Sequence, residues 1–293
     1  MKSICIKVTN QDVIDYLLEK LTNSELQEVY FSCKKFKIYN NIIIHYKGNY
    51  EKYFLKIISQ ILSGLILDLF EESLIKKIIR IEYFYFDKFE QKQIFDNTFD
   101  DLNDAEEAVY NKHMRFKILC NCFYIYIETN KSLNLKGFIT FRIKKYLQTL
   151  LEQIDKSVNK YIIEREYIEF ISLLKMYVNS EPSSIDIVYL IYNNNKPTLM
   201  DKNKNLIEIS DNILNNKYLS DISFSSNDYA LNALLNLVPQ KIYIYTIDSN
   251  CDEFINTIKL IFENRVEFCN NQLFLRLIGT VQSKHLFFYN KCV

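Results

Sequence analysis

The sequence predicts an α+β protein: a mainly helical middle section with one long helix, flanked by a small N-terminal sheet-and-helix unit and a C-terminal α/β unit. Three observations predict this class. Short runs rich in β-branched residues occur near both ends of the chain. Apolar residues recur at helical spacing from about residue 50 to about residue 180. Only 4 Gly and 3 Pro occur among 293 residues, so few helix breakers are present. We expect three segments, 1–70, 71–182 and 183–293.

The N-terminal segment begins with a strand. Residues 3–8 alternate apolar and polar side chains, and Asn10 or Asp12 can then cap a helix that reaches about Leu21. Residues 27–33 and 36–46 are rich in Val, Ile, Tyr and Phe, which predicts an antiparallel pair of strands. From Tyr50 the apolar positions follow a period of 3.6, so a second helix should pack on this sheet.

The middle segment reads as a series of helices. Residues 78–86 fit either a strand or a helix, and the preceding helical pattern favours a helix that ends near Tyr83. Asp87 and Glu90 have the spacing of a capping box, which predicts the next helix. A further helix is expected from Asp104 to about Thr129. Its run 118–127 is apolar on every side, which predicts a central helix surrounded by others.

The longest expected helix follows. Its apolar positions alternate spacings of four and three, a coiled-coil-like seam made of Leu135, Ile139, Ile143, Leu147, Leu150, Ile154, Val158 and Tyr161. Because no Gly or Pro lies between Phe138 and Ser180, one helix, or two with a bend at 164–166, should cover about 40 residues. Pro182 ends this helical region.

The C-terminal segment predicts a small α/β unit. Ser226, Asn227 or Asp228 can cap a helix that stops at Pro239, and 252–263 should form another helix. Strands are expected at residues 185–192, 197–201 (PTLMD), 205–210 (NLIEIS), 241–246, 266–269 (VEFC) and 273–278 (LFLRLI). A strand, helix, strand order over so few residues implies a right-handed crossover and a partly parallel sheet.

Composition and charge narrow the classes of partner. Lys+Arg and Asp+Glu both number 36, so no global field attracts nucleic acid, and nucleic-acid binding is disfavoured, although a local basic patch stays open. The 7 cysteines are odd in number and irregularly spaced, which favours reduced thiols in the cytoplasm. Charged residues interrupt the N-terminal apolar run, so no signal peptide is expected. The apolar stretch 57–67 is about half the length that a membrane span needs.

Signatures of catalysis or metal binding are absent from the sequence. His45, His113 and His285 have no nucleophile motif beside them, and no phosphate-binding glycine loop occurs. Cys120 and Cys122 lie on a predicted helix, where residues two apart point about 200° away from each other and cannot chelate together. We therefore expect no metal, no cofactor and no catalytic residue.

Two acids of the C-terminal unit are candidates for a ligand or active site. Asp248 and Asp252 follow an expected strand that leads into a helix, where open α/β sheets place ligand-binding acids. The alternative is that they cap this helix in a turn.

Phe138, Phe141 and Arg142 form the second candidate site. The two rings lie three residues apart and Arg142 follows Phe138 by four, so on one helix they could share a surface. They predict either a docking patch for a partner protein or a core contact of both rings in which Arg142 extends its charged end to solvent or pairs with an acid.

Two stretches of the sequence carry a resemblance to a known family. Residues 134–178, NLKGFITFRIKKYLQTLLEQIDKSVNKYIIEREYIEFISLLKMYV, closely resemble the central region of the YtxC family, which is associated with sporulation in spore-forming bacteria. DYALNALLNLVPQKIYIY and DEFINTIKLIFENRVEFC are similar to the C-terminal end of that family. The family has no established activity or catalytic residues, so none transfer to this chain.

The resemblance implies a sporulation-associated cytoplasmic protein that acts by binding or scaffolding a protein partner. Two alternatives stay open: a small-ligand-binding protein or enzyme that uses the acids of the C-terminal unit, and a nucleic-acid-binding protein.

Overall fold

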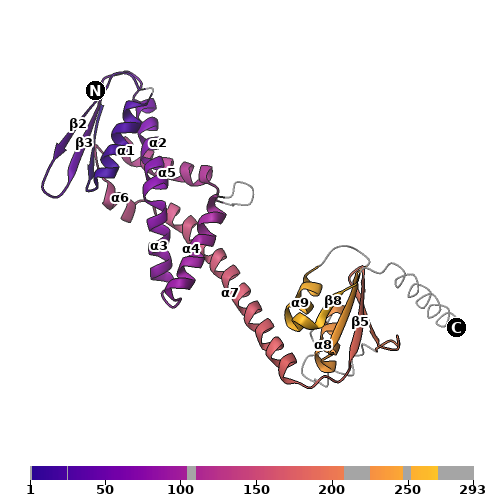
Figure 1. Cartoon of the computed structure of the whole chain (residues 1–293). Helices are drawn as coiled ribbons and strands as arrows, with labels where there is room; N and C mark the ends of the chain where they lie inside the picture. Colours follow the sequence, from indigo (N-terminus) through magenta and orange to yellow (C-terminus); the bar gives the residue numbers. More distant parts are fainter. Residues whose placement is uncertain (1, 25, 104–109, 208–224, 247–251, 270–293) are drawn as a thin grey trace. The chain divides into compact units, whose positions relative to one another are not determined.

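A computed structural model describes residues 2–24, 26–103, 110–207, 225–246 and 252–269 (Figure 1). These residues contain nine α-helices and two four-stranded mixed sheets, which confirms the α+β class with a helical middle. The chain divides into two compact units, Met1–Ile163 and Glu164–Val293, and the boundary falls inside the longest helix. The expected division into three segments stays a prediction, because compactness alone does not tell which segments fold independently.

The first sheet has the strand order β2-β3-β1-β4. Its strands are β1 (Lys2–Val8), β2 (Val29–Lys35), β3 (Asn40–Tyr46) and β4 (Ser132–Asn134). β3 pairs antiparallel with β2, as predicted, and also with β1, and β4 pairs parallel with β1. Ile4 and Ile6 of β1 lie opposite Ile44 and Ile42 of β3, and all four are buried, because alternate residues of a strand face the same side.

The first three helices of this unit are α1 (Gln11–Thr22), between β1 and β2, and α2 (Glu51–Leu69) and α3 (Glu71–Glu82), which follow β3. Asn10 caps α1 by accepting a hydrogen bond from the Asp12 amide at 3.1 Å, as predicted. α3 extends to Glu82 and is capped at Tyr83, which confirms the helical alternative for the start of the ambiguous run 78–86. Ile75 and Ile79, four residues apart, lie on the buried face of this helix.

No single helix among the described residues is long and apolar enough to cross a membrane. α2 and α3 together have the length and composition, but they are bent by 56° relative to each other.

The next two helices are α4 (Lys88–Asn103) and α5 (Lys112–Thr129). Asp87 and Glu90 form the predicted capping box of α4, with reciprocal bonds of 2.8 Å. The expected start of a helix at Asp104 lies outside the described residues, and α5 begins at Lys112, where Asn111 caps it. The prediction that α5 is surrounded on all sides is wrong, because Ile125 is 58% exposed and the fully buried residues of this helix recur only at every fourth position, from Arg115 to Ile127.

The predicted long helix is divided near its start. α6 (Leu135–Phe141) ends at Arg142, and α7 (Lys144–Ser180) then runs without interruption through 164–166, the expected place of a bend. The seam positions Ile143, Leu150, Ile154 and Val158 are all buried, so the four-three spacing did identify the face of α7 that packs in the first unit.

The second unit contains a sheet in the order β6-β5-β7-β8. Its elements are β5 (Ile187–Asn193), β6 (Lys196–Asp201), α8 (Ser226–Leu237), β7 (Lys241–Thr246), α9 (Glu253–Phe262), a short 3-10 helix (Glu263–Arg265) and β8 (Val266–Phe268). β5, β7 and β8 are parallel, which confirms the partly parallel sheet. Asn194 and Asn195 turn the β5–β6 hairpin with φ of 49° and 59°, a backbone that Asn tolerates.

One expectation for the second unit needs correction, and two others lie partly or wholly outside the described residues. Ser225 caps α8 in a capping box with Asp228, one residue earlier than predicted. Of the expected strand NLIEIS, Leu206 makes an isolated bridge to Met200, and residues 208–210 lie outside the described part of the chain. The expected strand LFLRLI lies wholly outside it.

Candidate docking site

The candidate site of the first unit is built on the corner between α6 and α7. Asn134 caps α6 by accepting a hydrogen bond from the Gly137 amide at 3.0 Å. α6 closes at Arg142, whose amide donates to the carbonyl of Phe138 at 2.8 Å. Ile143 is fully buried, so it anchors the chain in the core between the two helices. The corner therefore holds its exposed side chains on a fixed backbone.

Phe138 belongs to the core at this corner. Its side chain is 3% exposed, and its ring stacks on Phe123 with 4.3 Å between centroids. The edge of Tyr126 packs against it at 5.2 Å. These contacts favour the packing alternative for Phe138.

Phe141, three residues after Phe138 on α6, is 69% exposed, so the core takes up Phe138 and leaves Phe141 at the surface. α6 has only seven residues, and the boundary between its buried and exposed sides runs between positions 138 and 141.

Arg142 extends the exposed side of the corner. Its guanidinium carbon lies 5.9 Å from the centre of the Tyr126 ring, a cation–π contact. A depression of about 440 Å³ is lined by both rings, Phe138 and Phe141, together with Gly137, Arg142 and Lys144 and with Tyr126 and Asn134. This part of the surface therefore combines an exposed aromatic ring with two cations.

Of the two candidate acids of the second unit, Asp252 belongs to the described residues. Asp248 lies outside the described residues. Asp252 caps α9, since its Oδ1 accepts a hydrogen bond from the Ile255 amide at 3.1 Å. Its Oδ2 accepts a bond from the hydroxyl of Tyr192, and burial together with this acidic acceptor raises the pKa of that phenol. Within the described residues no Lys or Arg pairs with Asp252, so the contacts favour its capping role.

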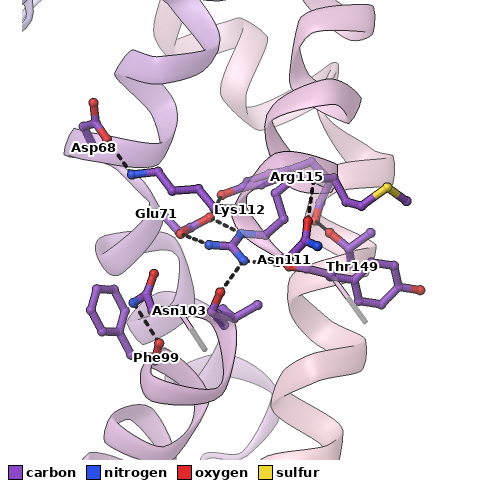
Figure 2. Close-up of polar contacts among 12 residues, drawn as sticks. Asp68, Glu71, Phe99, Asn103, Asn111, Lys112, Arg115 and Thr149 are labelled. Atoms are coloured by element: carbon purple, nitrogen blue, oxygen red, sulfur yellow. Dashed lines mark hydrogen bonds and ion pairs between the residues drawn. The ribbon is translucent and has the colours of Figure 1, made fainter. Parts of the chain in front are cut away.

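A buried polar cluster escaped the sequence analysis (Figure 2). Arg115 on α5 is fully buried and donates two hydrogen bonds of 2.9 Å to the carboxylate of Glu71, the first residue of α3. Its Nη1 donates to the carbonyls of Leu102 and Tyr110 at 2.8 and 2.6 Å. Tyr146 of α7 donates to the same carboxylate at 2.6 Å, and burial raises the pKa of this phenol.

The position of Arg115 in the sequence could have indicated this cluster. Arg115 precedes Leu119, Phe123 and Ile127 at intervals of four, so it lies on the buried face of α5, where a cation needs a partner. Its partner Glu71 is 44 residues away, and no local pattern relates the two. These hydrogen bonds join α3, α5 and α7. Both the guanidinium of Arg115 and the carboxylate of Glu71 are engaged in them, so the cluster has a structural role and does not form a reactive site.

The histidines and cysteines have no shared site in the described structure. His45 Nδ1 lies 2.8 Å from the Ser3 hydroxyl, His113 is exposed on α5, and His285 lies outside the described residues. Burial raises the pKa of the Cys120 and Cys122 thiols, which keeps them protonated. Across the described ranges no three His, Cys, Asp or Glu side chains gather as a metal site would require.

Comparisons with known proteins place these elements in a family. The model of the YtxC-like family matches residues 56–267, a range that contains 134–178 and all but the last two residues of the C-terminal stretches that suggested the resemblance. The uncharacterized protein YtxC of Bacillus subtilis (strain 168) is 24% identical over 133 residues, which cover 45% of this chain and 47% of that protein. The chain thus matches about half the length of this curated relative. No solved structure matches the chain. Because the family model covers most of its length, the chain belongs to the YtxC-like family.

Proposed function

We propose that this protein is a sporulation-associated cytoplasmic protein that binds or scaffolds a partner protein through the corner between α6 and α7. The observation that carries the proposal is the 69% exposure of Phe141 on a corner whose neighbours Phe138 and Ile143 are buried. A large ring on a fixed backbone loses little conformational entropy when a partner covers it. Burying such a side chain contributes about 1.5–3 kcal/mol.

The cations beside Phe141 support the same role. Arg142 and Lys144 line the depression with Phe141, and aromatic and Arg side chains dominate the binding energy of many protein interfaces. The partner surface that fits them has an apolar pocket for the ring and at least one carboxylate for the guanidinium.

The proposed location has separate support. Cys5, Cys33, Cys120, Cys122 and Cys269, the cysteines in the described residues, are all free thiols. Free thiols persist in a reducing compartment such as the cytoplasm. The enzyme alternative has less support, because the carboxylate of Asp252 is already engaged by an amide and a hydroxyl.

A pull-down from sporulating cells tests the proposal. The full-length protein and its Phe141→Ala and Arg142→Ala variants serve as bait, and Phe89→Ala is the control, because Phe89 is exposed to the same extent, 68%, on α4. A partner identified by mass spectrometry is then purified, and its affinity for each variant is measured.

We expect the two corner variants to weaken binding of the purified partner by at least about tenfold, with melting temperatures close to that of the wild type. Phe89→Ala should bind like the wild type. Normal binding by Phe141→Ala would exclude the corner as the docking site.

A further inference from the structure

A second surface of the first unit carries an independent inference: a groove between α2 and α5. The two helices are antiparallel, since Lys112 Nζ lies 3.5 Å from Asp68 Oδ1 and Cys120 Sγ lies 4.0 Å from the carbonyl oxygen of Ser59. The groove has a volume of about 1050 Å³ and is lined from Lys52 to Gln60 on α2 and from His113 to Tyr124 on α5. These ranges correspond to about 12 to 17 Å of helix, or about three turns.

The charged side chains that line this groove are all basic. Among the described residues that line it there is no Asp or Glu but there are four lysines: Lys52, Lys56, Lys117 and Lys145. In the described part of the chain none of these four makes an ion pair, although Lys112, also on α5, pairs with Asp68. Like charges that face one groove repel each other, so an acidic partner would relieve this repulsion.

The basic groove belongs to a wider separation of charge in the first unit. Residues 111–147 contain eight basic residues against the single acid Glu128: Lys112, Arg115, Lys117, Lys131, Lys136, Arg142, Lys144 and Lys145. Glu71 pairs with Arg115 and Asp68 pairs with Lys112, which leaves six. The balance of 36 cations and 36 acids over the whole chain therefore conceals a local basic surface.

The groove also exposes apolar and aromatic surface. Tyr53 and Met114 are each 44% exposed, and Phe116, Ile118 and Tyr124 line the groove with them. A thioether and aliphatic groups gain free energy when an apolar side chain covers them. The occupant that fits must therefore carry both carboxylates and apolar side chains.

We propose that the α2–α5 groove binds an acidic amphipathic helix of a partner protein, about three turns long. Its apolar face would lie on Met114 and the neighbouring aromatic rings, and its Asp and Glu side chains would reach the lysines. A flat bilayer cannot enter a groove between two helices. A nucleic-acid strand would satisfy the lysines, but its phosphates would leave Met114 and Ile118 without apolar contacts. The inference does not depend on the corner site, because the two surfaces share no residue.

Fluorescence anisotropy with a defined probe tests the inference. The probe is a dye-labelled peptide of about 12 residues with Leu at helical spacing on one face and Glu on the other. It is titrated with the full-length protein, with Lys56→Glu/Lys117→Glu, and with the control Lys77→Glu/Lys92→Glu. All four lysines are exposed, so both double variants change the charge equally and should fold.

The groove variant should bind the peptide at least about tenfold more weakly than the wild type, because two favourable charge contacts are lost. Raising the salt concentration should lower the affinity of the wild type for the peptide. The control variant should bind within about twofold of the wild type. A peptide with Lys in place of Glu should not bind.

Four results would overturn the inference. The first is equal peptide binding by the groove and control variants, and the second is the absence of peptide binding at about 100 µM protein. The third is tighter binding of an oligo-dT strand of about 20 nucleotides than of the peptide. The fourth is a wild-type dimer that the groove variant, but not the control variant, converts to a monomer. The third result would make nucleic acid the occupant, and the fourth would make it a second copy of the chain.

Discussion

Replacing Glu71 with Gln tests whether the buried cluster holds the first unit together. Glu71 and Arg115 have 4% and 0% of their surface exposed, and the carboxylate accepts three hydrogen bonds, two from Arg115 and one from Tyr146. The Glu71→Gln substitution keeps the shape of the side chain but removes its charge. Arg115 would then be a buried cation whose other partners are the carbonyls of Leu102 and Tyr110.

The expected loss of stability follows from that uncompensated charge. Removing the charge of one partner in a buried ion pair lowers the free energy of unfolding by about 3–5 kcal/mol. For a unit as large as Met1–Ile163, each kcal/mol lowers the melting temperature by about 2–4 °C, so Glu71→Gln should lower it by about 6–20 °C. The change should be visible by thermal unfolding monitored with circular dichroism.

The neighbouring Glu72 provides a matched control. It pairs with Lys76 four residues along α3, and its side chain is 59% exposed. Exposed pairs of this kind contribute about 0.3–0.5 kcal/mol, so Glu72→Gln should change the melting temperature by about 2 °C or less. If Glu71→Gln melts no earlier than Glu72→Gln, the cluster does not stabilise the unit and the argument from burial fails.

Three further predictions concern single side chains. Phe138→Ala should destabilise the first unit by about 3–5 kcal/mol in urea unfolding, because it empties the space between Phe123 and Tyr126; a change under about 1 kcal/mol would contradict its place in the core. Asp252→Ala should destabilise the second unit by about 1–3 kcal/mol, since α9 loses its cap and the Tyr192 hydroxyl loses an acceptor, whereas Asp252→Asn, which keeps the cap, should have a smaller effect in the same assay. Asp201 accepts hydrogen bonds from the backbone amides of Asn205 and Asn203, and these bonds lower its pKa. Its contribution to stability should therefore be complete above the ordinary pKa of an Asp and be lost as the pH falls through the lowered pKa. An ordinary pKa of Asp201 in an NMR titration would refute this.

Local patterns were sufficient for the elements whose signals lie within a few residues. The cap at Asn10, the capping box at Asp87 and Glu90, and the strand 241–246 were predicted because each depends on neighbours in the chain. The run 118–127 misled the prediction, because composition alone does not tell which side of α5 other helices cover, and Ile125 faces outward.

The sequence by itself determined the α+β class, the helical middle, the partly parallel C-terminal sheet and the family, since periodicity, caps and motif order are properties of the chain. Only the tertiary structure decided that the long helical stretch divides at Arg142, with Phe138 inside and Phe141 outside. It alone paired Glu71 with Arg115 across 44 residues and gathered the lysines of α2, α5 and α7 along one groove. The physical reason is that burial and charge pairing depend on which faces meet in space, and residues distant in the chain supply those faces.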